Sequence, residues 1–447
     1  MTSEFDPDQI LTTRTKGLRL RLTTTLAQLR QQLHNQPLPL TNDLFAWPLL
    51  AMDDDALAHN VATMASLCQQ RGVRHAPHVK TPMSAQLWAR QEAAGAWAAT
   101  VATPHQMRTA ISWGARRVLM ANQLLDVRDA KWIAEALAAD VGLEVWLQVD
   151  SPEGIELLRQ VFAGKTAQPH VLVELGVPGP SGRSTSRATG RTGVRGTGNL
   201  VNLAQAVIEA GLTLGGVTGY EAPAAMGDDA KANAAAVAAW CDDLAGAARA
   251  VLAIATDGGE FIVSAGGSNY PDVVLDRLAP SPSGESSIGD VPLVLRSGAY
   301  ITHDHGHYAE INPWARLPGG DWQMRPAITV WAQVISTPQP GLAFLNVGRR
   351  DVPSDQGLPV VLWRRDYGDG QLGPRVDLAP GHITVTELND QHAFLGGPGV
   401  AGLRPGDVVG LGISHPCTAF DKWRVGLVTK DDPTGQTMAI DLYSFDF

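Results

Sequence analysis

The sequence is poor in cysteine and lacks long apolar segments. Its three cysteines, Cys68, Cys241 and Cys417, are an odd number at wide spacing in a chain of 447 residues. This spacing does not indicate a disulfide framework, so we expect a protein of the reducing cytosol. No apolar run reaches the roughly 18 residues of a membrane-spanning helix. Residues 1–8 are polar and acidic and do not resemble a signal peptide, so the sequence predicts a cytoplasmic protein without a membrane span.

An excess of positive charge is also absent. The chain has 35 Lys and Arg residues against 45 Asp and Glu residues, a formal net charge of -10 at pH 7. This balance argues against non-specific binding to nucleic acid and against docking on an anionic membrane. The length is sufficient for two domains with a large core. We therefore expect a soluble protein whose partner is a small molecule.

Short apolar runs alternate with amphipathic segments between about residues 45 and 288. Residues 47–52 read as a strand, for example, and the next segment places Leu57, Val61 and Met64 on one helix face. Repeated βα units predict a parallel sheet with helical cover, and closure into a (β/α)8 barrel is the economical solution.

The pattern changes after about residue 290. Short β-type runs separated by Pro/Gly turns occupy residues 327–335, 342–347, 358–364, 382–388, 407–413, 425–429 and 438–443. Such runs predict an antiparallel all-β domain. We therefore expect three parts: an N-terminal segment at 1–44 with a helix at 12–32, a barrel at 45–288, and a β domain at 289–447. The Ser/Pro/Gly-rich residues 279–290 form the expected boundary.

His415 and Cys417 lie two positions apart near the end of the chain. On an extended backbone their side chains point to the same face. A neutral imidazole and a thiolate can together bind a zinc-like divalent cation. Two protein ligands leave positions open for water or substrate, which favours a catalytic metal over a structural one. The alternative is an ordinary strand end with a buried cysteine and a surface histidine.

Lys80 lies where an early barrel strand should end. The C-terminal ends of barrel strands form the catalytic mouth of that fold. A partly desolvated lysine there loses its proton more easily and becomes a nucleophile toward carbonyl groups. The alternative is a solvent-exposed lysine at a strand end.

Gly266, Gly267 and Ser268 follow an apolar strand at residues 261–264. Backbone N–H groups and a hydroxyl in this arrangement fit a phosphate cradle, although Gly-Gly turns after strands are common. Further upstream, residues 176–198 are rich in Gly, Ser, Thr and Arg. Their glycines argue against a helix, and we expect a mobile, functional loop.

A histidine cluster lies at residues 302–308, where His303, His305 and His307 alternate with Asp304 and Gly306. On a strand, three imidazoles with this spacing would share one face. A second metal site, contacts to a substrate carboxylate, and a merely polar strand at the domain junction are the alternatives. Tyr300 and Tyr308 could reach a pocket from here.

Four motifs, in this order along the chain, resemble those of the D-serine dehydratase/D-threonine aldolase family. That family belongs to the alanine-racemase-like class of pyridoxal-phosphate enzymes. The resemblance extends over about residues 45–425 and implies a pyridoxal-phosphate-binding barrel followed by a β domain, usually as a homodimer. The motifs are Ala76-Pro-His-Val-Lys-Thr81, Gly190-Arg-Thr-Gly-Val194, Ser264-Ala-Gly-Gly-Ser268 and Ser414-His-Pro-Cys417.

The resemblance also implies roles for individual residues. Lys80 would form the covalent link to the cofactor and act as the α-proton base. Arg191 would face the pyridine nitrogen, where a permanent charge discourages protonation of the ring; Arg183 and Arg187 are rival candidates. Further cofactor contacts would come from His78, Tyr220, Ser264, Gly266, Gly267 and Ser268. The metal ligands would be His415 and Cys417, and the substrate contacts Tyr300, His303 and His305.

Two reactions on D-3-hydroxy amino acids occur in this family. One is β-elimination of water, giving a 2-oxo acid and ammonia, and the other is retro-aldol cleavage to glycine and an aldehyde. Among family members, a His-x-Cys pair resembles the dehydratases and His-x-Asp the aldolases. A thiolate favours zinc over magnesium or manganese. We therefore expect a dehydratase that uses pyridoxal 5'-phosphate and Zn2+ or another divalent metal. The alternatives are an aldolase, a non-catalytic pyridoxal-phosphate-binding protein and, more weakly, a racemase.

Overall fold

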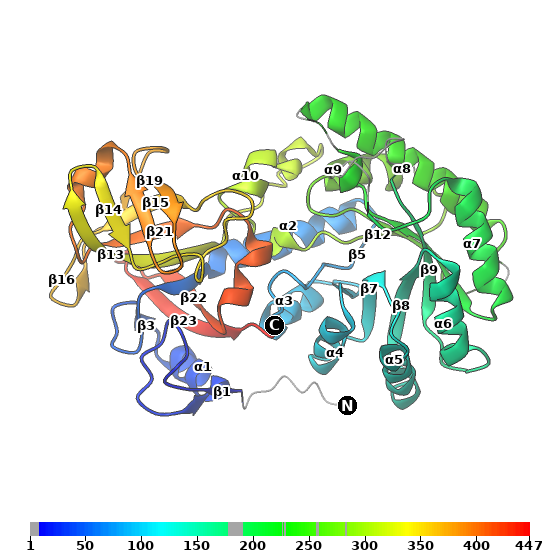
Figure 1. The fold of residues 1–447 in the computed structure, drawn as a ribbon, viewed down its shortest axis with the longest axis horizontal. Coiled ribbons are helices and arrows are strands. Elements are labelled where there is room, and N and C mark those ends of the chain that lie inside the picture. Colours follow the sequence, from blue (N-terminus) through cyan, green and yellow to red (C-terminus); the bar gives the residue numbers. More distant parts are fainter. Residues whose placement is uncertain (1–8, 178–190, 226, 228, 256–258, 282–283) are drawn as a thin grey trace.

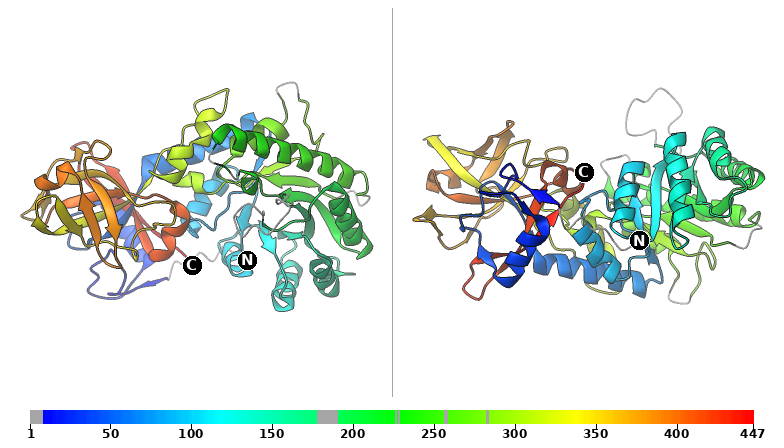
Figure 2. Two further views of the ribbon diagram at one scale, coloured as in Figure 1. Left: turned by 45° about the horizontal axis from the view of Figure 1, so that its top comes forward. Right: turned by 90° about the horizontal axis from the view of Figure 1, so that it is seen from below.

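The computed structural model describes residues 9–177, 191–225, 227, 229–255, 259–281 and 284–447. They form a barrel and a β domain that lie side by side (Figures 1 and 2). Among the described residues, no helix is both long and apolar enough to cross a membrane.

Eight parallel strands form the barrel sheet, in the order β5-β12-β11-β10-β9-β8-β7-β6. Its first and last strands meet through a parallel bridge between His78 and Thr100 and a hydrogen bond from Val79 N to Thr100 O of 2.9 Å, so the sheet curls into a ring. The strands are β5 (Arg74–His75), β6 (Ala99–Val101), β7 (Arg117–Gln123), β8 (Glu144–Val149), β9 (His170–Leu175), β10 (Thr213–Gly219), β11 (Ile262–Ala265) and β12 (Leu293–Leu295). The predicted α/β barrel is confirmed.

Helices cover the outside of this sheet (Figure 1). Helix α5, for example, buries Ala130, Ile133, Ala134 and Leu137, which recur at helical spacing. The expected cap of α6 is also present, because Ser151 Oγ accepts the Gly154 N–H at 3.3 Å and Pro152 opens the helix. The helices are α2 (Asp54–Gln70), α3 (Ala85–Ala93), α4 (Pro104–Ser112), α5 (Val127–Ala139), α6 (Pro152–Phe162), α7 (Thr197–Glu209), α8 (Ala230–Leu252) and α9 (Pro271–Leu278).

The β domain is built on one large sheet with the strand order β18-β15-β21-β13-β4-β22-β23-β3. A smaller extension, β14, β20 and β19, continues from β13, and helix α1 packs on β23. All pairs are antiparallel except β4 with β22. The elements are α1 (Leu26–Asn35), β3 (Leu38–Pro39), β4 (Leu49–Asp53), β13 (Ile328–Gln339), β14 (Leu342–Leu345), β15 (Val360–Arg365), β18 (Val376–Asp377), β19 (Thr384–Leu388), β20 (Ala393–Gly396), β21 (Val408–Gly412), β22 (Val425–Asp431) and β23 (Thr437–Ser444). Two small hairpins complete it: β1 (Ile10–Leu11) with β2 (Thr24–Thr25), and β16 (Tyr367–Gly368) with β17 (Gln371–Leu372).

Two strands differ from the sequence prediction. Strand β4, expected in the barrel, lies between β13 and β22 in the β domain. Strand β12, which was not predicted and lies in the range assigned to the β domain, completes the barrel, so residues 279–290 connect two barrel elements. Four of the five residues of β4 are buried, which indicates cover on both faces but not which sheet supplies the neighbours. Helix α2 consequently leads from one domain into the other.

The helix expected at residues 12–32 is wrong in its position. Helix α1 begins after Thr25, whose hydroxyl accepts the Gln28 N–H while the Gln28 side chain accepts the Thr25 N–H. Upstream of this capping box, Gly17 has a φ of 87° and Leu18 bridges to Phe45, so the chain is not helical there.

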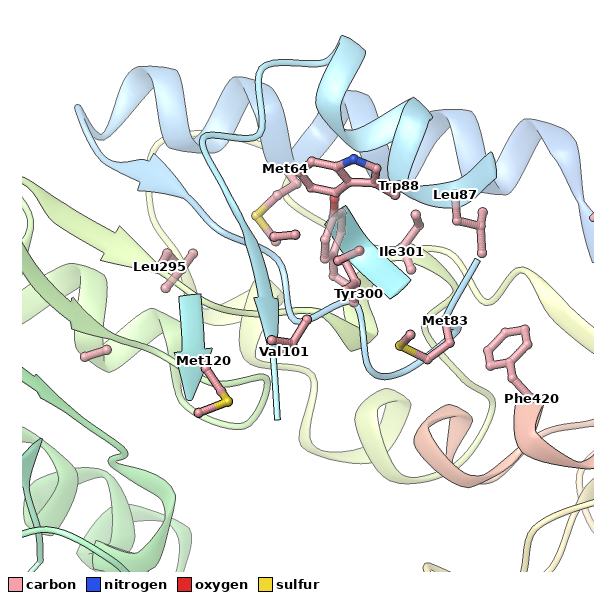
Figure 3. Close-up of a cluster of buried hydrophobic side chains, with 14 of the residues drawn as sticks. Met64, Met83, Leu87, Trp88, Val101, Met120, Leu295, Tyr300, Ile301 and Phe420 are labelled. Atoms are coloured by element: carbon pink, nitrogen blue, oxygen red, sulfur yellow. The ribbon is translucent and has the colours of Figure 1, made fainter. Parts of the chain in front are cut away.

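A continuous apolar core joins the two domains. Figure 3 shows Met64 of α2 and Trp88 of α3 packed around Tyr300 and Ile301, with Phe420 nearby. Tyr300, Ile301, Ala419 and Phe420 therefore belong to the same core as the helices of the barrel.

Candidate active site

A cavity of about 370 Å³ lies at the C-terminal ends of the barrel strands. Barrel residues line most of it, and Tyr308, His415 and Cys417 line it from the other domain. The polar lining from the barrel comprises His78, Lys80, Thr81, Asn122, Gln148, Glu174, Arg191, Thr192, Tyr220, Ser268 and Arg296.

Lys80 lies in the turn after β5 and reaches this cavity. Burial lowers its pKa, and the positive charges of Arg191 and Arg296 act in the same direction. Cys417 opposes this shift. An amine with a lowered pKa is a better nucleophile and base near neutral pH.

His78 stands beside Lys80 as a neutral ring. Burial and then the positive charge of Lys80 keep its pKa well below the usual value. Its Nδ1 is buried and has no hydrogen-bond partner among the described residues. A flat, uncharged ring with an unused nitrogen suits contact with a planar heteroaromatic ligand.

Arg296 is a further site residue that the sequence did not indicate. It is 7 % exposed and donates to Thr218 Oγ1 at 2.5 Å, Gly219 O at 2.6 Å and Ser264 Oγ at 3.1 Å. It thereby ties the ends of β10 and β11 to β12. Ser264, expected to contact a cofactor, is fully buried under this guanidinium and does not line the cavity.

The Gly-Gly-Ser turn has a partner that the sequence did not reveal. The carboxylate of Glu221, which is 0 % exposed, accepts the N–H groups of Gly267 at 2.7 Å and Gly266 at 3.2 Å. These two donors of the expected phosphate cradle are therefore occupied. Gly267 and Ser268 still line the cavity, together with Gly298 and Ala299, and the Ala299 N–H donates to Ser268 Oγ at 3.4 Å.

Arg191 and Tyr220 lie together at the same mouth. The Arg191 guanidinium lies 4.6 Å from the centre of the Tyr220 ring, a cation–π distance. Burial, followed by the charge of Glu221, raises the pKa of Tyr220 to about 12. The rival arginines, Arg183 and Arg187, lie outside the described residues.

Glu174 is the centre of a buried polar network that the sequence analysis missed. Its carboxylate accepts from Gln123 Nε2 at 2.8 Å, Thr192 Oγ1 at 2.9 Å and Gln148 Nε2 at 3.3 Å. Burial raises its pKa, which favours the neutral acid. Gln123, Gln148 and Glu174 each lie at or near the C-terminal end of an apolar strand, and this shared position is the signal that could have identified them.

The expected metal ligands, His415 and Cys417, lie directly after β21. Asp355 accepts a hydrogen bond from His415 Nδ1 at 2.7 Å and another from Thr418 Oγ1 at 2.6 Å. A carboxylate on Nδ1 fixes the tautomer that leaves Nε2 free to bind a metal. Asp355 is sixty residues from His415 and belongs to no local motif, so no sequence pattern indicates it.

The pKa values of His415 and Cys417 depend on their contact with each other and with their neighbours. Burial alone would lower the pKa of His415, but its hydrogen bonds to Cys417 and Asp355 raise it to about 9. Burial would raise the pKa of Cys417, yet His415 and Thr81 bring it below the ordinary value. Thr81 Oγ1 lies 3.3 Å from the sulfur. Among the described residues, no group of three or more His, Cys, Asp or Glu side chains could hold a metal, so a cation bound by this pair would keep open positions.

The histidine cluster does not form the expected strand. Asp304 accepts the N–H groups of Gly306, Tyr308 and Ala309 and so caps α10 (His307–Ile311). The chain therefore turns here, and His303 has a φ of 47°.

As a result, three of the expected substrate contacts do not line the main cavity. His303 is buried, and His305 lines a separate cavity of about 160 Å³ in the β domain. Tyr300 is buried in the apolar core of Figure 3, where its hydroxyl accepts from Gln91 Nε2 at 3.0 Å. Tyr308, in contrast, lines the main cavity.

Two family models match the chain. Residues 52–258 match the N-terminal domain of alanine racemase, and residues 327–429 match a putative serine dehydratase domain. The first match covers most of the cavity residues of the barrel, and the second ends after His415 and Cys417.

Curated relatives include both kinds of lyase. The chain is 26% identical over 364 residues to a 3-hydroxy-D-aspartate aldolase of Paracoccus denitrificans (strain Pd 1222), covering 76% of this chain and 85% of that protein. It is 31% identical over 127 residues to a D-threo-3-hydroxyaspartate dehydratase of Delftia sp. (strain HT23), covering 23% of this chain and 33% of that protein.

Solved structures show the same fold. The D-threonine aldolase from Filomicrobium marinum matches with a TM-score of 0.71 and 22% identity, over 92% of this chain and 97% of its own. The dehydratase from Delftia sp. HT23 matches with a TM-score of 0.63 and 20% identity, over 90% and 97%.

Proposed function

We propose that the chain is a D-3-hydroxy amino acid dehydratase of the D-serine dehydratase/D-threonine aldolase family; the two family-model matches and the lyase relatives support this proposal. The reaction removes the α-proton and the β-hydroxyl as water and yields a 2-oxo acid and ammonia. The observation that carries this proposal is the His415–Cys417 pair, oriented by Asp355 in the wall of the cavity that contains Lys80.

The cavity residues fit pyridoxal phosphate. Lys80 provides an amine of lowered pKa, His78 a neutral ring face with an unused Nδ1, and Arg191 a permanent charge at the mouth. Ser268, beside Gly298 and Ala299, would hold the phosphate, because the N–H groups of Gly266 and Gly267 already donate to Glu221. The cofactor would serve as the electron sink for the bond broken at Cα.

The metal pair fits a soft divalent cation. His415 and Cys417 would hold zinc, since a thiolate and an imidazole favour it over magnesium. Such an ion would supply Lewis acidity at the β-hydroxyl, which is otherwise a poor leaving group.

Lys80 would transfer the proton, and the buried side chains of the cavity would exclude water. With its pKa lowered by burial, the Nζ of Lys80 can hold the proton taken from Cα. Tyr308 borders the metal pair and closes the cavity on that side, and burial followed by Cys417 raises its pKa, so its hydroxyl stays protonated. These side chains limit access of water to the reacting carbon.

An aldolase is the second candidate. The 26% identical aldolase, which the chain matches over 85% of its length, favours it. Cys417 favours the dehydratase, because a His-x-Cys pair is typical of the family's dehydratases and a His-x-Asp pair is typical of its aldolases.

Product analysis separates the two reactions. Purified protein with pyridoxal phosphate and zinc is incubated with D-serine, D-threonine and D-threo-3-hydroxyaspartate. A 2-oxo acid with equimolar ammonia supports the proposal, whereas glycine with an aldehyde or glyoxylate assigns the aldolase. Absence of any turnover across these substrates would favour a binding protein without catalysis. We also propose a homodimer, which light scattering of the loaded protein tests.

A further inference from the structure

A buried arginine lies far from the active site, at the end of β15. Arg365 is 5 % exposed and follows Trp363 by two positions, so both side chains lie on the same face of the sheet. Its guanidinium lies 5.8 Å from the centre of the Trp331 ring and 6.0 Å from that of Trp363. Two aromatic rings thus flank the cation.

The side chain of Arg365 has no hydrogen bond or ion pair within the described part of the chain, and its Nε is fully buried without a partner. The carboxylates that influence it are engaged elsewhere. Asp377 accepts from Arg375 Nε at 2.6 Å, and Asp431 accepts from Thr437 Oγ1 at 2.7 Å. Arg375 adds a second positive charge nearby. Burying a guanidinium in this way is unfavourable unless an anion completes its hydrogen bonds.

A cavity of about 400 Å³ opens beside this guanidinium. Its walls come from the N-terminal segment, from the chain after β17, and from the turn between β22 and β23. Among the described residues that line it, Arg365 is the one with a charged side chain; the others are Leu40, Thr41, Leu372, Gly373, Pro374, Thr434, Gly435, Gln436 and Thr437.

We propose that this cavity is a second ligand site, which binds the carboxylate of a small organic acid through Arg365. The planar guanidinium matches a carboxylate with two parallel hydrogen bonds. Leu40, Leu372 and Pro374 provide apolar surface for the carbon skeleton, and this favours an organic acid over inorganic phosphate. The site is separate from the catalytic cavity, since the two share no lining residue.

Succinate is a suitable probe. The full-length, cofactor-loaded protein is titrated with succinate at constant ionic strength, by calorimetry and by thermal unfolding, and compared with Arg365→Met. Arg364→Met is the matched control, because Arg364 is the adjacent residue, lies on the opposite face of β15 and pairs with Asp366 at 2.7 Å. We expect succinate to bind wild type and Arg364→Met alike, and Arg365→Met at least about tenfold more weakly.

A second readout distinguishes binding from support of the fold. Without succinate, Arg365→Met should unfold at the same temperature as wild type or higher, because it removes an unpaired buried charge. Arg365→Lys should bind succinate with intermediate affinity, since it keeps the charge but loses the planar fork. This variant also tests the proposal if Arg365→Met does not fold.

Two results would overturn the proposal. One is equal succinate affinity in wild type and Arg365→Met; a lower unfolding temperature of that variant would then make Arg365 a structural residue. The other is failure of the wild-type protein to bind succinate, whether or not it binds inorganic phosphate.

Discussion

The two walls of the active-site cavity differ in what determines the pKa values of their ionisable groups. On the barrel wall, burial drives ionisable groups toward their neutral forms: it lowers the pKa of Lys80 and His78 and raises that of Glu174. On the β-domain wall, burial acts in the same sense on His415 and Cys417 but is outweighed by their mutual contact.

This difference follows from how each group is partnered. Glu174 accepts hydrogen bonds from neutral side chains, which compensate burial only in part. Asp355 is less buried, and hydrogen bonds from Thr418 and then His415, together with the charge of His415, bring its pKa below the usual value. A wall of neutral groups suits proton transfer, whereas a thiolate beside an imidazole that releases its proton on binding suits a metal cation. The cavity therefore combines two environments, each from a different domain.

The largest effect should come from the barrel wall. Lys80→Ala removes the amine whose lowered pKa makes it the base, and we expect kcat to fall on the order of 10³-fold or more. The absorbance of covalently held cofactor should disappear as well. Lys430→Ala, an exposed lysine of the β domain paired with Asp55, is the control and should leave both unchanged. If Lys80→Ala retained turnover, Lys80 would not be the base that takes the α-proton.

The β-domain wall should affect the metal without affecting the cofactor. We expect Cys417→Ala to lose bound zinc and roughly 10²- to 10³-fold in kcat, while the cofactor absorbance stays. Elemental analysis and the absorbance spectrum measure the two quantities. Cys68→Ala, a change of a core cysteine, is the control. Full activity of a metal-free Cys417→Ala would contradict the division of tasks between the walls.

Asp355 should have an intermediate effect. Asp355→Asn keeps the shape but weakens the hold on His415 Nδ1, and we expect zinc affinity to fall about 10- to 100-fold. Asp355→Glu should recover part of it. Competition with a chromophoric chelator gives the affinity, with Asp366→Asn as a control for an exposed carboxylate. Unchanged affinity in Asp355→Asn would show that the carboxylate does not orient the ligand.

The smallest effect concerns Glu221, which is buried behind the barrel wall. Burial raises its pKa in the folded protein, so the unfolded chain ionises first as pH rises. The wild-type protein should therefore lose stability relative to Glu221→Gln as pH rises from about 4 toward the folded pKa, and the difference should level off above it. Urea unfolding of both proteins across this range measures it. A difference that is independent of pH would mean that the carboxylate is not driven toward its neutral form.

Site residues that belong to local motifs could be predicted from the sequence. Site residues whose partners are distant in the sequence could not. Lys80, His415 and Cys417 reach one cavity, as their motifs predict. Arg296 and Asp355 belong to no local pattern, because their partners come from strands and loops that only the fold brings together.

The errors in the fold have the same origin. Periodicity identified the helix faces of the barrel, since each face depends on residues within a few turns. The sheet of β4 and β12 depends on distant partners, and an apolar strand looks alike in either sheet. At residues 303–307 the carboxylate of Asp304 caps a helix, and this local competition overrides the alternating pattern.

The central place of β4 in the β domain has a consequence for how the protein is made. The chain begins this sheet at Leu38 and Leu49, leaves through α2 to build the entire barrel, and returns at Ile328. On the ribosome, β4 is made before its neighbours β13 and β22, so the barrel can close while most strands of the β domain are still unsynthesised. His415 and Cys417 follow the whole barrel along the chain. The proposed metal pair therefore joins the Lys80 cavity only after the whole barrel has been made, and a product that stops before residue 415 lacks it.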